Sequence, residues 1–184
     1  IRHHFGAQIS ILNGALEKWI TEGRPVSSAP GYYPPSEFRA DPRWTRGIAY
    51  KEDVLDALNT DGSCRVVNAL PTECHLGTSD IVYGSRKGHI TGSINVPMPQ
   101  LVHWDTGVFA DAEGMRAEFA RHDLLSADGV ITYCGGGGCA TTDGFALALL
   151  GYTNVAMYDN SLHEWGADPS LPMTDPSNGR KESC

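Results

Sequence analysis

One cysteine stands at the end of an apolar, β-type run and is followed by four glycines in a row. The run covers residues 131–133, the cysteine is Cys134, and a helical pattern begins at about residue 140. Consecutive glycines let the backbone turn its N–H groups inward, and the first turn of a helix adds unpaired donors and a positive dipole end. The pattern therefore predicts an anion cradle built from the backbone amides of six residues: Gly135, Gly136, Gly137, Gly138, Cys139 and Ala140.

A sulfur atom held in such a cradle favours its charged forms, because both a thiolate and a persulfide are anions. We therefore interpret Cys134 as an activated nucleophile. The alternative is a glycine turn beside a buried, unreactive thiol. Four consecutive glycines cost more backbone entropy than a turn requires, which favours the reactive interpretation.

The chain is acidic and has the composition of an ordinary globular protein. It has 184 residues, of which 41% are hydrophobic and 20% charged, and a net charge of −8 with a pI near 5.2. Because no Lys/Arg cluster occurs, this charge argues against nucleic acid and against anionic membrane surfaces as partners. No apolar stretch reaches the ~20 residues that a membrane-spanning helix needs, so no membrane partner is expected.

The cysteines form neither a disulfide framework nor a metal-binding pattern. Their number is odd, no C-x-x-C pair occurs, and the histidines and cysteines show no compact ligand spacing. We therefore expect a reducing, cytoplasmic location, with no metal and no cofactor. The five cysteines are Cys64, Cys74, Cys134, Cys139 and Cys184.

Hydrophobic periodicity predicts strands that alternate with helices over residues 47–173. The expected helices cover residues 51–58, 111–122 and 140–150, with a helical turn at 161–165. The expected strands cover residues 65–69, 130–133 and 155–158, with a short one within 88–97, and residues 71–87 are expected to form a polar loop. This alternation favours an α/β fold, a parallel sheet flanked by helices, whose binding crevice lies beyond the carboxyl ends of the strands. Cys134 lies at one such end.

The beginning of the chain repeats the pattern of its end. A strand at residues 9–12 and a helix at 15–22 match the later strand and helical turn, with Leu16 and Trp19 at the same spacing as Leu162 and Trp165. The match suggests two copies of one domain, although a short amphipathic unit can also match by chance. A Pro-rich linker follows at residues 24–46, and its aromatic residues are expected to lie against a domain surface. The Pro/Ser-rich stretch from Pro169 predicts a loose end to the chain, with residues 174–184 as its tail.

Three stretches resemble the rhodanese superfamily, in the family's order and at suitable spacing. They are Gly88-His89-Ile90-Thr91-Gly92-Ser93-Ile94-Asn95-Val96-Pro97, Tyr133-Cys134-Gly135-Gly136-Gly137 and Tyr158-Asp159-Asn160-Ser161-Leu162-His163-Glu164-Trp165-Gly166. The resemblance implies a rhodanese fold and a sulfurtransferase that carries a sulfane sulfur as a persulfide on Cys134. The implied donor is a small molecule such as thiosulfate or 3-mercaptopyruvate, and the implied acceptor is cyanide or a thiol.

Residues 11–19 and 23–26 also resemble the end of the inactive first domain in tandem-domain sulfurtransferases of the thiosulfate or 3-mercaptopyruvate type. On this basis residues 1–23 are expected to be the last strand and helix of an N-terminal rhodanese-like domain. That domain would precede Ile1, in the same chain or as a separate one, and would be a partner of the catalytic domain at 47–173.

The chain departs from the tandem enzymes at the positions that hold the donor. Those enzymes carry Asp-x-Arg after the first strand of this domain and a second arginine four residues on, where this chain has Asn68, Leu70 and Cys74. Gly135 and Gly136 also replace the Arg-Lys of thiosulfate enzymes and the serine of mercaptopyruvate enzymes. These differences leave the donor open.

Other interpretations remain at this stage. A phosphatase of the same superfamily needs an arginine in the loop to clamp phosphate, and residues 135–142 contain none. A non-catalytic module that carries sulfur, responds to redox conditions or docks a partner is the main alternative. His89 is expected to be a structural histidine, and Asp159 and Glu164 are expected to fix the last turn. Oxidation could join Cys139 to Cys134, and the alternative is that Cys139 only fills a small-residue position.

Overall fold

The computed structural model describes residues 10–37 and 47–177. Its centre is a parallel sheet of five strands in the order β1-β8-β7-β2-β4. Because the strands are parallel, their carboxyl ends meet at one edge of the sheet. The strands are β1 (Ile48–Ala49), β2 (Cys64–Asn68), β4 (Ile94–Asn95), β7 (Gly129–Tyr133) and β8 (Val155–Tyr158).

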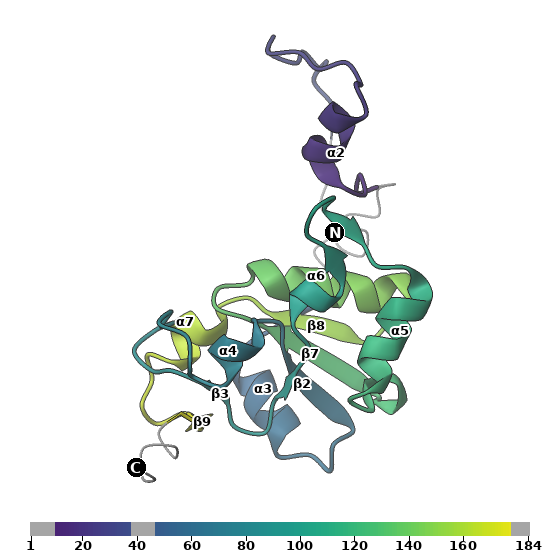
Figure 1. Ribbon diagram of the computed structural model, residues 1–184. Coiled ribbons are helices and arrows are strands. Elements are labelled where there is room, and N and C mark those ends of the chain that lie inside the picture. Colours follow the sequence, from purple (N-terminus) through teal and green to yellow (C-terminus); the bar gives the residue numbers. More distant parts are fainter. Residues whose placement is uncertain (1–9, 38–46, 178–184) are drawn as a thin grey trace.

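Helices cover both faces of this sheet (Figure 1). They are α3 (Lys51–Leu58), α4 (Thr72–His75), α5 (Ala112–Ala120), α6 (Gly138–Leu149) and α7 (Ser161–Trp165), with short 3-10 turns η1 (Met98–Gln100) and η2 (Leu124–Ser126). Two small antiparallel pairs complete the domain: β3 (His89–Ile90) with β9 (Met173–Thr174), and β5 (Val102–His103) with β6 (Val108–Phe109).

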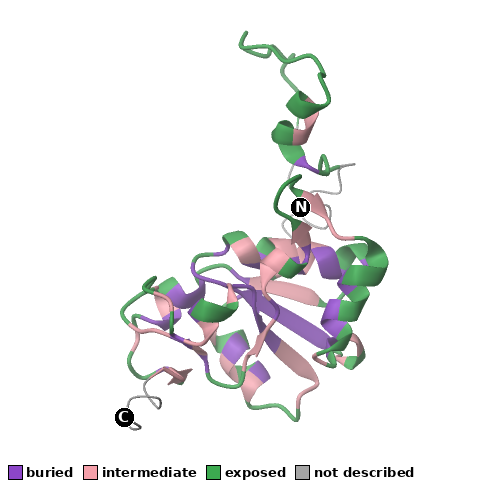
Figure 2. Ribbon diagram, viewed as in Figure 1, coloured by how far each residue is buried: buried purple, intermediate pink, exposed green. Residues whose placement is uncertain are grey.

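The alternation of side chains along the central strands divides the core into two clusters. Val66 and Ile131 pack with α3 and α7 on one face. Val67 and Val130 pack with α5 and α6 on the other face. Figure 2 accordingly shows the central strands buried between helices that are exposed only on their outer sides. The predicted α/β fold with a parallel sheet is therefore confirmed.

Most of the predicted elements occur close to their expected bounds. The helix at 51–58 is α3, and the expected strands are β2, β7 and β8, each within one residue. The helix expected at 140–150 begins earlier, at Gly138, because Gly137 takes a left-handed conformation with φ +86° as its N-cap. It ends before Gly151, whose φ of +95° stops it as predicted. The polar loop at 71–87 is not all loop, since it contains α4.

The end of the described chain is more ordered than its composition predicts. Met173–Thr174 forms β9 and pairs with β3, so that Met173 lies opposite Ile90. Leu171 is buried, and the indole N–H of Trp165 donates a hydrogen bond to the carbonyl of Pro172 at 3.0 Å. The expectation of a loose end from Pro169 is therefore wrong up to Ser177. Residues 178–184 lie outside the described residues.

The strand predicted at residues 9–12 is not formed. Residues 10–12 have no regular structure, and Ile9 lies outside the described residues. A strand needs a neighbour for its backbone hydrogen bonds, and none of residues 10–23 joins the sheet. Their link to the domain includes the N–H of Phe109, which donates to Asn13 Oδ1 at 3.0 Å.

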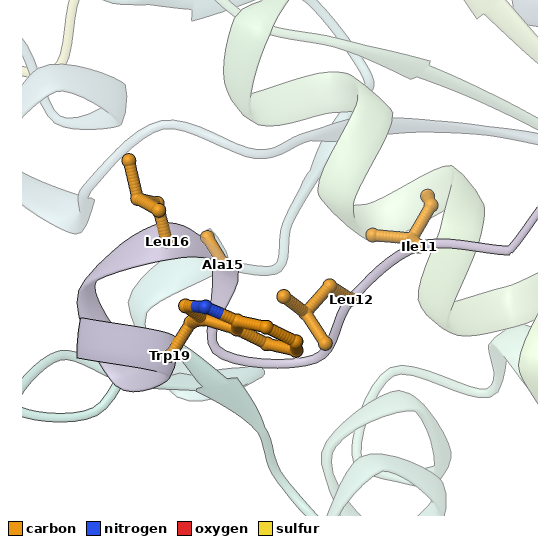
Figure 3. A pocket seen from close by; sticks show the side chains of 5 residues that line it. All are labelled: Ile11, Leu12, Ala15, Leu16 and Trp19. Carbon is orange, nitrogen blue, oxygen red and sulfur yellow. The ribbon is translucent and has the colours of Figure 1, made fainter. Parts of the chain in front are cut away.

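The predicted helix at 15–22 is present as α2 (Ala15–Thr21), and none of its residues is buried. Leu12 is 56% and Leu16 is 59% exposed, whereas Leu162, the repeat counterpart of Leu16, is buried. Figure 3 shows an open apolar pocket at this place, with the Trp19 ring beside Leu12. It has a volume of about 520 Å³ and is lined by Ile11, Leu12, Ala15, Leu16 and Trp19.

The described part of the Pro-rich linker does not lie on the domain. Residues 24–37 are exposed throughout, and Tyr32 and Tyr33 are 87% and 86% exposed. The expectation that these aromatics cover a domain surface is therefore wrong for the two tyrosines, because the prolines at 30, 34 and 35 keep the segment extended. Phe38 and Trp44 lie outside the described residues.

Candidate active site

Cys134 directly follows β7 and lies under the start of α7. Its N–H donates to Ser161 Oγ at 3.1 Å, and its carbonyl accepts from the N–H of Leu162 at 3.1 Å. The next carbonyl, that of Gly135, accepts from the N–H of His163 at 3.0 Å. The first residues of α7 thus fix the backbone on both sides of the sulfur, and Cys134 is only 2% exposed.

Ser161 holds this arrangement in an unusual backbone conformation. Its φ is +50°, in the left-handed region that residues with a side chain rarely occupy, and it is fully buried. Its hydroxyl accepts from the N–H of Cys134 and donates to the carbonyl of Tyr158 at 2.7 Å. Strained residues of this kind concentrate at functional sites. In the sequence, Ser161 is recognisable only as part of the motif at residues 158–166, since a residue type does not reveal a positive φ.

The first two glycines of the loop lie directly under aromatic rings. A Cβ added at Gly135 would lie 2.1 Å from Tyr83 Cε1, and one added at Gly136 would lie 2.8 Å from His163 Cδ2. The two rings meet edge to face, with centroids 5.6 Å apart and an interplanar angle of 84°. Any side chain at these two positions would displace the rings that cover the loop.

At the third position, Gly137, both a close contact and a positive φ require glycine. At the fourth position, Gly138, neither of these constraints applies. A Cβ at Gly137 would lie 2.5 Å from Asp159 Oδ1, and the φ of this residue is +86°. A Cβ at Gly138 would meet nothing within 4 Å. The glycine run is therefore a packed loop of residues 135–137 rather than a loose turn.

The backbone amides of residues 135–138 are free to bind an anion. Within the described part of the chain they donate to no backbone or side-chain acceptor. Gly138, Cys139 and Ala140, which the sequence analysis assigned to the cradle, lie in the first turn of α6. That turn brings the positive end of a twelve-residue helix to the same place. The structure therefore brings the seven predicted site residues together. Residues 135–137 form the loop, and residues 138–140 form the first turn of α6 where a loop was expected.

Tyr83 reaches the loop because its neighbours bind the end of α7. The backbone N–H and hydroxyl of Ser85 both donate to the carbonyl of Gly166, at 3.3 and 2.9 Å. Arg86 donates to four main-chain carbonyls at 2.6–3.2 Å, those of Trp165, Gly166, Asp168 and Leu171. This arginine is near the site, but backbone carbonyls engage four of its five guanidinium N–H groups, so its role is to anchor the segment.

The Gly88–Pro97 motif supports the other side of β7. The hydroxyl of Tyr133 accepts from the N–H of Ile90 at 3.0 Å and lies 2.7 Å from Ser93 Oγ. His89 Nδ1 donates to the carbonyl of His75 at 2.7 Å, and the two imidazole rings stack at 3.7 Å. His89 therefore has the hydrogen-bonded, structural role that was expected of it.

A pocket of about 300 Å³ opens beside the loop. Its lining carries more negative than positive charge, since it includes two carboxylates and an imidazole. Glu164 accepts from the hydroxyl of Tyr158 at 2.6 Å and from the side chain of Asn160 at 3.1 Å, and these hydrogen bonds hold its pKa below the usual range. The full lining is Gly136, Asp159, Asn160, His163 and Glu164.

Among residues 10–37 and 47–177, no three His, Cys, Asp or Glu side chains gather closely enough to hold a metal ion. Within those ranges, no helix has the length and apolar character that crossing a membrane requires.

A family model described as a rhodanese-like domain matches residues 53–168, which is more than half of the chain. The chain belongs to the rhodanese-like domain family. Among curated relatives, the sulfur carrier protein TtuD of Thermus thermophilus is 30% identical over 174 residues, covering 90% of this chain and 61% of the relative. Thiosulfate sulfurtransferase of Mus musculus is 32% identical, covering 94% and 58%. The chain therefore spans about 60% of the length of these relatives.

Solved structures show the same fold. The anaerobic ergothioneine biosynthesis enzyme of Chlorobium limicola, solved with trimethyl histidine, superposes with a TM-score of 0.82 at 20% identity. The match covers 94% of this chain and 43% of the enzyme. At this identity the likeness shows the fold alone.

This rhodanese domain has no cationic side chain at the positions where tandem enzymes carry their donor-binding arginines. Leu70 and Cys74 are buried in the core, at 2% and 8% exposure. Asn68 accepts from the N–H of Leu70 at 3.0 Å and donates to His75 Nδ1 at 3.1 Å, so the amide is fully used within the fold. The loop of this rhodanese domain also lacks the arginine with which a related phosphatase would clamp phosphate.

Proposed function

We propose that this rhodanese domain is a sulfurtransferase that carries a sulfane sulfur as a persulfide on Cys134. The observation that supports it best is the position of the sulfur at the carboxyl end of β7, next to the free amides of residues 135–138 and the start of α6. Those amides stabilise the thiolate before transfer and the outer sulfur of the persulfide after it.

The reaction has two steps. With thiosulfate as donor, the Cys134 thiolate attacks the outer sulfur, and sulfite leaves with the bonding electrons. With 3-mercaptopyruvate, it attacks the thiol sulfur, the C–S bond breaks, and the enolate of pyruvate leaves with the bonding electrons and takes up the thiol proton. A thiol or cyanide then takes the outer sulfur and returns the thiolate. Gly135, Gly136, Gly137, Gly138, Cys139 and Ala140 bind the anionic sulfur through their N–H groups, and no side-chain cation takes part.

The experiment is mass spectrometry of the reduced protein after incubation with thiosulfate or with 3-mercaptopyruvate. A gain of about 32 Da, one sulfur atom, should map to Cys134. Addition of cyanide should then remove the adduct and form thiocyanate. Cys134→Ser should abolish both steps. Cys64→Ser is the matched control, because Cys64 lies at the opposite end of the sheet, paired with Gly129. An adduct on another cysteine would refute the assignment.

A second candidate function is a sulfur carrier without turnover of small acceptors. The name of the Thermus relative and the buried Leu70 and Cys74 favour it. A carrier would gain the adduct but transfer it to cyanide no faster than a free cysteine persulfide does, so the same assay separates the two. We place either function in the cytoplasm, where the four described free thiols stay reduced.

The domain assignment is part of the proposal. Residues 1–23 would be the end of an N-terminal rhodanese-like domain, residues 24–46 an interdomain linker, residues 47–173 the catalytic domain and residues 174–184 a tail. The exposed apolar face of α2 supports this division. In that arrangement the N-terminal domain covers Leu12, Leu16 and Trp19. Expression of this chain with such a domain from a full-length relative should give a stable pair, and Leu16→Asp should separate it.

A further inference from the structure

Three of the four described cysteines gather around the loop. Cys74 of α4, Cys134 and Cys139 belong to one apolar cluster together with Tyr83. All three thiols are near enough to the Tyr83 hydroxyl to raise its pKa electrostatically, in addition to the effect of burial. The fourth, Cys64, is at the far end of β2. The persulfide mechanism uses only one of the three clustered thiols.

Cys139 is the thiol best placed to react with Cys134. It lies five residues further along the chain, in the first turn of α6, and it packs against the apolar cluster that contains Cys134. The four residues between them are glycines, whose backbone can adjust to a disulfide if the rings of Tyr83 and His163 that pack on the loop shift with it. Cys74 belongs to a different element, the helix α4.

We propose that Cys139 is a resolving cysteine, which converts the Cys134 persulfide into a Cys134–Cys139 disulfide and releases sulfide when no acceptor is bound. This activity rests on the proposed function, since it starts from the persulfide. It gives the domain a second product, hydrosulfide, besides the transferred sulfane sulfur.

The step balances without any external oxidant. The sulfur of Cys139 attacks the inner sulfur, Cys134 Sγ, and forms the new S–S bond. The bond between Cys134 Sγ and the outer sulfur breaks, and the outer sulfur leaves with the bonding electrons and the Cys139 proton as hydrosulfide. The sulfane sulfur is reduced to sulfide while the two cysteine sulfurs are oxidised to the disulfide. An external dithiol then reduces the disulfide and restores the enzyme.

The environment of Cys139 makes this step slower than transfer to an acceptor. Burial and the adjacent Cys134 and Asp143 raise the pKa of the Cys139 thiol, so that most of it is protonated and weakly nucleophilic. The persulfide therefore lasts long enough to meet an acceptor thiol, and Cys139 discharges it only when none arrives.

The test follows the persulfide in the absence of an acceptor. The reduced protein is loaded with thiosulfate under anaerobic conditions, freed of excess donor and incubated alone, while its intact mass and the free sulfide are measured. In the wild type, the adduct of about 32 Da should disappear, and the protein should become about 2 Da lighter than its reduced, unloaded form. About one sulfide should be released per adduct, and the peptide map should show a Cys134–Cys139 disulfide. Cys139→Ser and Cys139→Ala should keep the adduct and release roughly tenfold less sulfide or lower. Cys64→Ser should behave as wild type.

Two outcomes overturn the inference. One is sulfide release by both Cys139 variants at the wild-type rate. The other is a disulfide from Cys134 to Cys74, which Cys74→Ser would then abolish. Failure of the proposed function looks different, since neither thiosulfate nor 3-mercaptopyruvate would form the adduct. In that case inorganic polysulfide loads the thiol chemically, and release or retention of sulfide still decides whether Cys139 resolves it.

Discussion

The ring of Tyr83 occupies the space that a side chain at Gly135 would need. A Cβ on Gly135 would lie 2.1 Å from Cε1 and 2.6 Å from Cζ of this ring, both well inside van der Waals contact. The two residues come from segments about fifty positions apart, and the anchoring of Ser85 and Arg86 to the end of α7 fixes the ring. The loop beside Cys134 is thus shaped by a tyrosine that the sequence motifs do not include.

Gly135→Ala should lower thiosulfate-to-cyanide transfer by roughly tenfold to hundredfold, because displacement of the ring shifts the loop that holds the sulfur. Gly138→Ala is the matched control and should keep nearly full activity, since a Cβ there meets nothing within 4 Å. In a Tyr83→Ala background the Gly135→Ala change should cost much less, which a double-mutant cycle measures. Equal losses for Gly135→Ala in both backgrounds would show that the ring does not exclude the side chain.

Ser161→Ala should destabilise the fold by about 1–3 kcal/mol, because the buried N–H of Cys134 and the carbonyl of Tyr158 both lose their partner. Ser161→Gly loses the same hydrogen bonds but relieves the left-handed backbone, which is worth about 1 kcal/mol. The glycine variant should therefore be the more stable of the two in urea unfolding. An alanine variant as stable as the glycine variant would argue that the φ of +50° costs nothing.

The sequence predicts the sheet and the position of Cys134 at the end of β7 well because local signals carry both. The apolar run before Cys134 and the glycines after it determine β7, the loop and the start of α6. Two-residue strands such as β9 carry no such signal, and Met173 pairs with Ile90 only because the chain returns there. The roles of Tyr83 and Ser161 also have no local signal in the sequence. Hydrogen bonds from Ser85 and Arg86 to the end of α7 place Tyr83, and a positive φ distinguishes Ser161. The strand expected at residues 9–12 has the right pattern but no neighbouring strand.

Asp159→Asn should raise kcat/KM for thiosulfate by about two- to fivefold, because it removes a repulsion of about 0.5–1 kcal/mol between the carboxylate and an anionic donor. Asp159 lines the pocket beside the loop, and its Oδ1 lies against Gly137. Asp128→Asn changes the net charge equally at an exposed site before β7 and should have no such effect. The gain should shrink at high salt. Equal gains for both variants would indicate a general effect of net charge.

His75 should make the fold less stable in mild acid. Its Nδ1 accepts from the amide of Asn68, and burial, with a smaller contribution from His89, lowers the pKa of His75 from 6.5 to about 4. Between these two values the unfolded chain binds more protons than the folded one, so the free energy of unfolding should fall as the pH falls from about 6.5 towards about 4. In His75→Gln this part of the dependence should be absent. Urea unfolding at several pH values compares the two slopes, and parallel slopes would contradict the assignment.

Asp143 should make the fold less stable as the pH rises, which is opposite to the effect of His75. This residue of α6 is fully buried, its carboxyl oxygens have no hydrogen-bond partner within the described residues, and burial raises its pKa well above the usual range. The folded protein therefore keeps a proton that the unfolded chain releases above about pH 4, so stability is lost as the pH rises from there towards the folded pKa. Asp143→Asn has a similar shape and no titration, and it should flatten this loss and be more stable than wild type at neutral pH. A variant that is less stable than wild type at neutral pH would show that the carboxyl has a partner that the described residues do not include.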